Sequence, residues 1–336
     1  MMRVALLSGG VGGARCALAL DIWRRETRSR LDLTAIVNVG DDFTHLGLRI
    51  SPDIDSVLYH LGDLGDTSRG WGRAGDSATI AEQLRRHLPE AAWFHLGDLD
   101  LGHSLIRTRL LAQGLTLSEV TAKFAEDFGI EASVRPVTDD PSPTVVDVPA
   151  EVPAETLWPD EASGTAERSL GFQEWWVRGR AEPMPCRFRS PAAAEARPAP
   201  GVLDAIRDAD VVVIAPSNPI VSVTPVLDIP GVREAVRATS APVVGLSPII
   251  GGRPVRGWAD RCLAVAGVEC SATGVRDFYG ARESGGLLDG WLLDPTDATP
   301  GPHPMPTTAS ELRFGGDERD TRIVEALWEL VEALPR

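Results

Sequence analysis

Four glycines lie within five positions near the start of the chain, between the apolar run 4–7 and the apolar-periodic segment 14–23. This order is typical of a strand, a glycine turn and a helix. Glycine lacks the Cβ atom that would keep a ligand from the backbone, and the free N–H groups at a helix start bind oxyanions. The loop therefore predicts a nucleotide or phosphoester site at Gly9, Gly10, Val11, Gly12 and Gly13.

Two familiar phosphate-binding patterns match this loop only in part. A Walker loop places Lys and Ser or Thr after its last glycine, whereas Ala14, Arg15 and Cys16 follow here. The dinucleotide pattern G-x-G-x-x-G is missed by one residue in its two best frames, because Ser8 replaces the first glycine or Arg15 the last. A nicotinamide site is disfavoured but stays an alternative, and so does a tight turn without a ligand.

Polar or glycine-rich turns follow four further predicted strands, over 33–39, 92–96, 210–215 and 242–246. In a doubly wound sheet the carboxyl ends of the strands lie at one edge, so these turns converge with the glycine loop on one crevice. We expect N–H groups for phosphate there and Asn218 for a base or phosphate. The turns are Gly40-Asp41-Asp42, Gly97-Asp98, Ser217-Asn218 and Ser247 to Arg253.

Four aspartates, Asp41, Asp42, Asp53 and Asp55, lie within fifteen residues. Carboxylates beside a phosphate loop repel the ligand unless a cation intervenes, and Mg²⁺ held by one or two Asp removes that conflict. Asp42 and Asp55 are the preferred ligands, with Asp41 and Asp53 as alternates. Asp55 could also take the proton from an attacking hydroxyl. For each aspartate alone, capping of backbone N–H groups is the competing interpretation.

The composition narrows the class of protein. A net charge of −15 argues against a surface built to neutralise nucleic acid, and Lys123 is the only lysine, so arginine carries nearly all positive charge. The four cysteines form no C-x-x-C pair and the histidines no zinc pattern. No signal peptide and no apolar run near the roughly 20 residues of a membrane span is present, which predicts a cytoplasmic protein without a membrane partner.

Several segments together resemble one family, the CofD-like phospholactate transferases that make the deazaflavin coenzyme F-420. They occur in order over residues 1 to about 293. The segments are Ser8-Gly-Gly-Val-Gly-Gly13, Val37-Asn-Val-Gly-Asp-Asp42, Ile50-Ser-Pro-Asp-Ile-Asp-Ser56, Gly70-Trp-Gly72, Leu96-Gly-Asp98, Phe172-Gln-Glu-Trp-Trp176, Ala215-Pro-Ser-Asn-Pro-Ile220 and Ser247-Pro-Ile-Ile-Gly-Gly252.

The resemblance implies an α/β enzyme with a three-layer, Rossmann-like, mostly parallel sheet and a small helical lobe. The core would comprise residues 1–50 and 90–299, with surface insertions at about 149–200. The lobe would comprise residues 51–89 and extend at most to 128. Residues 300–336 would form a linker and a C-terminal helix. Such enzymes are homodimers that use Mg²⁺. They transfer a phosphorylated three-carbon acid from a guanosine diphospho donor to the terminal ribityl hydroxyl of the deazaflavin Fo, releasing GMP.

Carried over by position, the resemblance gives Asp55 and His95 contacts to Fo, although His95 replaces the basic residue associated with that position. Trp71 would stack on the flat heterocycle. Asp42 and Asp55 combine the catalytic and metal-binding roles. The guanosine diphospho part would be held by Gly9, Gly10, Val11, Gly12, Gly13, Ser217, Asn218, Ser247, Gly251 and Gly252.

The acid and two rival functions stay open. The Gly-Gly-Val-Gly-Gly-Ala-Arg variant resembles the branch associated with a phosphoenolpyruvate-derived donor, which favours enolpyruvyl over lactyl transfer. A related non-catalytic family shares the glycine loop and binds UDP-sugars, but Trp71 and the Phe-Gln-Glu-Trp-Trp segment argue against it. The third function is a nicotinamide dehydrogenase, disfavoured by the imperfect fingerprint.

Overall fold

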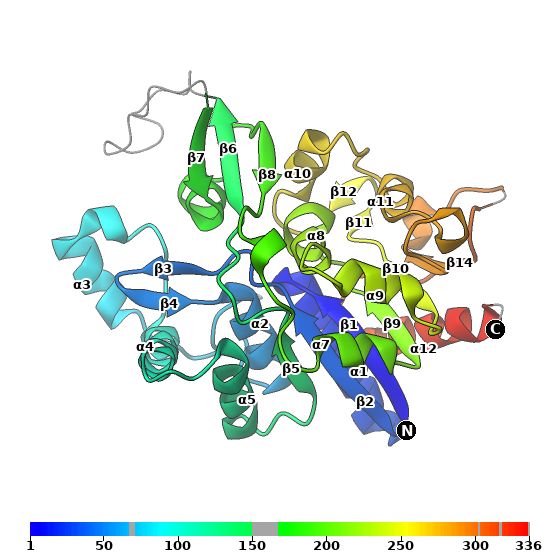
Figure 1. The fold of residues 1–336 in the computed structure, drawn as a ribbon, viewed down its shortest axis with the longest axis horizontal. Coiled ribbons are helices and arrows are strands. Elements are labelled where there is room, and N and C mark those ends of the chain that lie inside the picture. Colours follow the sequence, from blue (N-terminus) through cyan, green and yellow to red (C-terminus); the bar gives the residue numbers. More distant parts are fainter. Residues whose placement is uncertain (67–70, 150–166, 302, 316–317, 335–336) are drawn as a thin grey trace.

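The chain folds around a seven-stranded parallel sheet, which confirms the predicted Rossmann-like α/β class (Figure 1). A computed structural model describes residues 1–66, 71–149, 167–301, 303–315 and 318–334. The strand order is β14-β13-β10-β9-β1-β2-β5. The bounds are β1 Met2–Ser8, β2 Leu31–Val37, β5 Ser133–Pro136, β9 Val211–Ile214, β10 Val243–Leu246, β13 Gly290–Leu293 and β14 Thr307–Ala309.

The strand order reverses between β1 and β9. From β1 the chain crosses through α1 (Gly10–Thr27) to β2 on one side, and from β9 through α8 (Thr224–Leu227) and α9 (Val232–Ala238) to β10 on the other. Because such crossovers are right-handed, α1 and α9 lie on opposite faces of the sheet. The reversal leaves a crevice at the carboxyl ends of β1 and β9, where ligands of such sheets bind.

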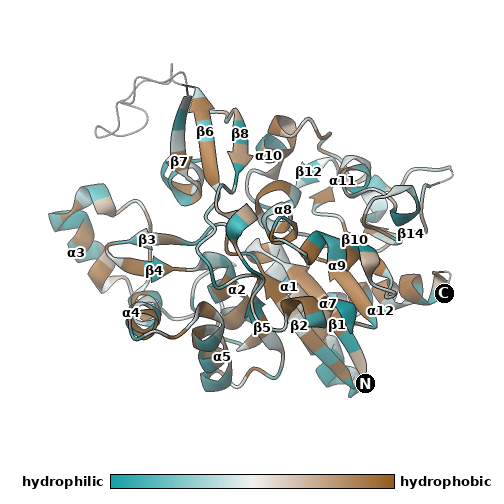
Figure 2. Ribbon diagram, viewed as in Figure 1, coloured by the Kyte–Doolittle hydropathy of each residue, from teal (hydrophilic) through white to brown (hydrophobic). Residues whose placement is uncertain are grey.

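The central strands are apolar because helices cover both faces of the sheet. Residues 211–214 and 243–246 are fully buried runs, and the strands of the sheet are mostly brown in the hydropathy view (Figure 2). The helix α2 (Pro52–Leu61), predicted as part of a small lobe, packs against α1 and buries Ile54, Val57 and Leu58 in the main core. In the described part of the chain no helix is both long and apolar enough to span a membrane.

The strand predicted over 92–96 is not formed. The segment follows the short helix η1 (Pro89–Ala91) as turns and bends, and β5, not this segment, is the neighbour of β2. Trp93 and Phe94 instead pack with Phe43 and His45, with ring centroids 4.8 to 5.9 Å apart. A short aromatic run gives the same sequence pattern whether it joins a sheet or a ring cluster, which is why the prediction was wrong.

The segment of surface insertions carries a second, antiparallel sheet of β6 (Val145–Pro149), β7 (Glu167–Gly171) and β8 (Arg187–Arg189). Of the surface insertions predicted at about 149–200, residues 150–166 lie outside the described residues. The tail after residue 300, predicted as a linker and a helix, also contributes β14, which pairs with β13, before α12 (Glu318–Ala333). These two additions build the walls of the site described below.

The remaining helices and strands are short or peripheral. They are β3 Phe43–His45, β4 Leu48–Ile50, α3 Thr79–His87, α4 Asp98–Ala112, α5 Leu117–Asp127, η2 Glu174–Arg178, η3 Ala193–Glu195, α7 Val202–Arg207, η4 Pro219–Val223, β11 Ile249–Ile250, β12 Arg253–Pro254, α10 Ala259–Val265, α11 Ala272–Tyr279, η5 Arg282–Ser284 and η6 Pro295–Asp297.

Candidate functional site

A cavity of about 880 Å³ opens at the carboxyl edge of the sheet, above the crevice between β1 and β9. The turns after β1, β2, β9 and β10 all contribute to its lining, so the convergence expected from the sequence is confirmed for these four strands. The fifth segment, 92–96, reaches the cavity although it is no strand. Of the predicted nucleotide contacts, the cavity is lined by Gly9, Gly10, Val11, Gly12, Ser217, Asn218 and Ser247.

The glycine loop is held directly against the turn after β9. The Ser217 hydroxyl donates to the Gly9 carbonyl at 2.6 Å. A Cβ atom on Gly12 would lie 2.3 Å from the Pro216 carbonyl oxygen, and Gly10 has a φ of +60°, so neither position tolerates a side chain without strain. Gly13 packs against Ser8 below the cavity and does not line it. The loop thus presents the first turn of α1 to the cavity, as an oxyanion site requires.

A pair of carboxyl groups, Asp41 after β2 and Asp53 in the first turn of α2, lies in the cavity wall. The two side chains hydrogen-bond each other, Asn38 Nδ2 donates to Asp53 Oδ2 at 2.9 Å, and Gln173 Nε2 to Asp41 Oδ2 at 3.2 Å. Asp41 Oδ1 is buried and accepts no hydrogen bond from the described residues. Burial raises the pKa of both groups, and for Asp41 the charge of Asp53 adds to the effect.

Such a pair needs a proton or a cation between its oxygens. Among the described residues no set of three or more His, Cys, Asp and Glu side chains is arranged to hold a metal. Two carboxylates suffice for Mg²⁺, however, when substrate phosphates and water complete its coordination. The buried Asp41 Oδ1, which accepts no hydrogen bond from the described residues, and the neighbouring Asp53 carboxylate therefore fit a magnesium ion.

The preferred metal ligands of the sequence prediction, Asp42 and Asp55, lie behind the cavity wall. Asp42 accepts hydrogen bonds from Arg49 at 3.0 Å and from the Ser51 hydroxyl at 2.8 Å, while burial raises its pKa to about 6. Asp55 is paired through both oxygens with the buried guanidinium of Arg107. Because arginines already neutralise both carboxylates, the geometry favours the alternates, Asp41 and Asp53, as the carboxylates that meet a ligand.

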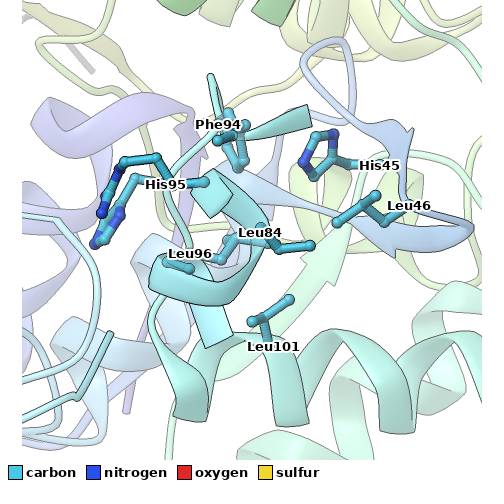
Figure 3. A pocket seen from close by; sticks show the side chains of 10 residues that line it. His45, Leu46, Leu84, Phe94, His95, Leu96 and Leu101 are labelled. Carbon is cyan, nitrogen blue, oxygen red and sulfur yellow. The ribbon is translucent and has the colours of Figure 1, made fainter. Parts of the chain in front are cut away.

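Aromatic side chains line two parts of the cavity. Those of residues 71 and 93–95 lie near the β3–β4 hairpin that follows β2, whereas Phe172 and Trp176 follow β7 and the Trp176 ring lies against Gly257. His95 meets the edge of Trp71, with ring centroids 6.4 Å apart, and Trp71 keeps 43% of its surface exposed. Figure 3 shows Phe94 and Leu84 between His95 on one side and His45 and Leu46 of the β3–β4 hairpin on the other, around a small cavity of about 10 Å³. The set that lines the large cavity is Trp71, Trp93, Phe94, His95, Phe172 and Trp176. A flat heterocycle can stack on such a wall.

Three arginines, Arg15, Arg256 and Arg313, line the cavity on the side of the glycine loop and the β10 turn. Burial and then the nearby charge of Arg256 lower the pKa of Arg15, so two cations lie close together. The predicted contacts Gly251 and Gly252 are absent from this lining. Their N–H groups donate to the Asp297 carboxylate at 2.8 and 3.2 Å, so a side chain already takes the place that a phosphate would occupy.

Sequence reasoning missed the arginines and two residues of the β7–η2 region, Gln173 and Trp176. The Phe172-Gln-Glu-Trp-Trp176 motif indicates this region, but from the sequence its two tryptophans are interpreted as packing residues. That interpretation is confirmed for Trp175, which is fully buried, whereas Trp176 lines the cavity. No spacing marks the arginines; only the near-absence of lysine pointed to guanidinium groups as anion ligands.

Comparisons with known proteins identify the family of the chain. A family model described as 2-phospho-L-lactate transferase CofD matches residues 4–305. The chain belongs to the CofD family. It is therefore a transferase, as the motifs predicted.

Relatives named phosphoenolpyruvate transferase are similar over most of the chain. The protein of Mycolicibacterium smegmatis is 43% identical over 301 residues, which cover 88% of this chain and 89% of the relative. That of Nocardia farcinica is 45% identical over 296 residues, with 88% and 85% covered. That of Thermobifida fusca is 42% identical over 333 residues and covers 98% of both chains.

Among solved structures, a Bacillus halodurans protein aligns with a TM-score of 0.56, covering 97% of this chain and 100% of that one. At 18% identity this likeness shows the fold alone.

The close approach of Gly12 to Pro216 predicts a specific cost. Gly12→Ala places a Cβ atom against a backbone oxygen, so the loop or the β9 turn must shift, and we expect a loss of about 1–3 kcal/mol in the free energy of unfolding. Gly102→Ala in α4 is the matched control, because its Cβ would meet nothing within 4 Å and alanine favours a helix. Chemical denaturation measures both. Equal stability of the two variants would contradict the close approach.

The buried ion pair behind the cavity predicts a second cost. Asp55→Asn leaves the Arg107 guanidinium, 1% exposed, without its carboxylate, and breaking a buried pair destabilises a protein by about 3–5 kcal/mol. Asp63→Asn removes the partner of Arg25 on the surface and should change little, since both side chains are solvated. Urea unfolding curves measure the free energy of unfolding of the two variants. An Asp55→Asn variant as stable as the wild type would refute the structural role of this pair.

Proposed function

We propose that this enzyme transfers a phosphoenolpyruvyl group from a guanosine diphospho donor to the terminal ribityl hydroxyl of the deazaflavin Fo, releasing GMP, in the biosynthesis of coenzyme F-420. One observation carries the proposal. A single cavity joins a glycine loop with nearby arginines to an aromatic wall, and the carboxyl pair of Asp41 and Asp53 lines the same cavity. An anionic nucleotide and a flat, uncharged heterocycle can therefore meet at these carboxyl groups.

The donor is assigned to the side with the glycine loop. Backbone N–H groups of the first turn of α1 suit the diphosphate, and Ser217, Asn218 and Ser247 border the same side. Arg15 and Arg256 add the charge that a phosphate or a carboxylate of the donor requires. The acceptor is assigned to Trp71, His95 and Trp176, whose rings offer stacking surface.

The transfer is a substitution at the phosphorus that bears the enolpyruvyl group. The ribityl oxygen forms a P–O bond, the bond to the bridging oxygen breaks, GMP leaves with that electron pair, and the hydroxyl proton goes to a base. Asp53 and Asp41 are the carboxylates placed to accept this proton or to bind Mg²⁺, which neutralises charge on the phosphate oxygens when bound. The rest of the catalysis is positioning, because phosphoryl transfer needs little covalent work by the protein.

Phosphoenolpyruvate is the preferred acid for two reasons. The relatives at 42–45% identity carry the name phosphoenolpyruvate transferase, and the glycine loop has the variant associated with that donor. A 2-phospholactyl donor differs by two hydrogens and the shape of one carbon. The proposal further includes a homodimer in the cytoplasm, as expected from the family, and sedimentation equilibrium tests the dimer.

The proposed reaction predicts a defined product. Purified enzyme incubated with Fo, Mg²⁺ and the enolpyruvyl guanosine diphospho donor should yield the phosphoenolpyruvyl ester of Fo together with GMP, both identified by mass. The lactyl donor should react more slowly. Binding of a UDP-sugar or of NADH without any Fo binding, followed by fluorescence titration, would replace the proposal by the regulatory or the dehydrogenase function.

The carboxyl pair predicts how pH and Mg²⁺ change stability. Because the folded state raises both pKa values, the contribution of this pair to the stability of the metal-free protein should be fully present below the ordinary Asp pKa of about 4 and should be lost as the pH rises through the raised values. Mg²⁺ should restore that stability. Asp41→Asn should flatten the pH dependence and abolish the response to Mg²⁺, as measured by thermal unfolding.

Asp32→Asn, at an exposed position of β2, is the matched control and should behave as the wild type. If Mg²⁺ raises the Tm of Asp41→Asn as much as that of the wild type, the metal is bound elsewhere.

A further inference from the structure

The segment Leu312–Phe314 lies in the cavity wall, although it belongs to the tail of the chain. It follows β14 and precedes α12. The family model ends at residue 305, before this piece of wall, although the Thermobifida fusca relative is similar over 98% of the chain.

The backbone of this segment is fixed at two points, and the residue that follows it at a third. Leu312 N donates to Asp294 Oδ2 at 3.2 Å, Arg15 Nη1 donates to the Phe314 carbonyl at 3.0 Å, and Gly315 N donates to Asp320 Oδ1 at 2.8 Å. The side chains of Leu312 and Phe314 are 3% and 8% exposed and belong to the main core. The segment is therefore an anchored wall, which can position a side chain for binding.

Arg313 lies between these two buried residues and is exposed. Arg15, which holds the Phe314 carbonyl, and Arg256 line the same cavity, so three guanidinium groups face one region of a chain whose net charge is −15. Arg313 interacts electrostatically with the Asp294 carboxylate. That carboxylate is already engaged, because its oxygens accept hydrogen bonds from Thr296 and Leu312. A cationic region of this kind suits a polyanionic ligand.

The position of the segment indicates which of the two proposed substrates, donor or acceptor, it contacts. Asp294 follows β13 and Ser247 follows β10, so the segment lies on the β10–β13 side of the crevice. Asp41 follows β2, and Trp71 and His95 lie beside the hairpin that comes next, on the other side. Fo carries no phosphate and gains little from a guanidinium group. The nucleoside diphosphate of the donor carries the charge that such a group binds.

We infer that Leu312–Phe314 forms a selectivity wall for the nucleoside diphosphate part of the donor and that Arg313 binds its anionic group. This inference rests on the proposed function, because it takes the donor site as given. Arg313 contributes to binding of the donor and does not contribute to the carboxyl pair or to binding of the acceptor.

Titration calorimetry with GDP as the probe tests the inference on the full chain. Arg313→Ala should weaken GDP binding about 10-fold, since one charge-assisted contact is lost, and Arg313→Lys should retain part of the affinity. The salt dependence of GDP binding should fall in Arg313→Ala. Arg322→Ala on the exposed face of α12 is the matched control and should bind GDP as the wild type does. Binding of Fo should be unchanged in all variants.

The outcomes distinguish a failure of the selectivity wall from a failure of the proposed function. If the wild type binds GDP and Arg313→Ala, with an unchanged thermal unfolding curve, binds it equally well, the selectivity wall is wrong and the proposed function stands. If the wild type does not bind GDP, the donor assignment itself fails and the inference fails with it. A loss of Fo binding in Arg313→Ala would place Arg313 on the acceptor side and would also overturn the inference.

Discussion

The close approach of the glycine loop to the turn after β9 is the constraint on which the site depends. Only a residue without Cβ allows position 12 to lie against the Pro216 carbonyl, and the Ser217 hydroxyl then bonds the backbone of Gly9. This contact joins the two halves of the sheet at the place where the strand order reverses. The first turn of α1 and the turns after β9 and β10 consequently face one cavity.

Arginines decide which of the four clustered aspartates can meet a ligand. Arg49 and Arg107 neutralise Asp42 and Asp55 behind the wall, and the pairing of Asp55 with Arg107 fixes the first turn of α2 against α4. The same turn carries Asp53, two residues earlier, on the cavity side. A buried ion pair adds little net stability, because desolvation of the two charges offsets their attraction, but it can hold a helix in one orientation. Its consequence here is that Asp53 faces Asp41.

The fold and much of the site could be predicted from local patterns. Apolar runs ending in Gly, Asp or Ser identified β1, β2, β9 and β10, and the rule that parallel strands end at one edge placed their turns together. Local patterns could not distinguish Asp41 from Asp42, since adjacent residues of a turn point in different directions and their partners are distant in sequence. Arg107 lies 52 positions from Asp55, and Gln173 lies 132 positions from Asp41. Likewise, the run 92–96 reads as a strand because its aromatic residues do not reveal whether they will pack against a sheet or against each other.

The distribution of charge around the cavity indicates how an anionic ligand would be oriented in it. The chain as a whole is acidic, yet Arg15, Arg256 and Arg313 line the cavity on the side of the glycine loop and the β10 turn, and the carboxyl pair follows β2 on the other side. A polyanionic ligand is repelled by most of the surface and attracted at this one region, so the field favours entry with its anionic groups toward the glycine loop. Asp41 and Asp53 lie in the wall of the same cavity, and because burial raises the pKa of both, the pair holds a proton or needs a cation between its oxygens. In the proposed reaction, Mg²⁺ held by this pair would couple binding of the ion to binding of the donor.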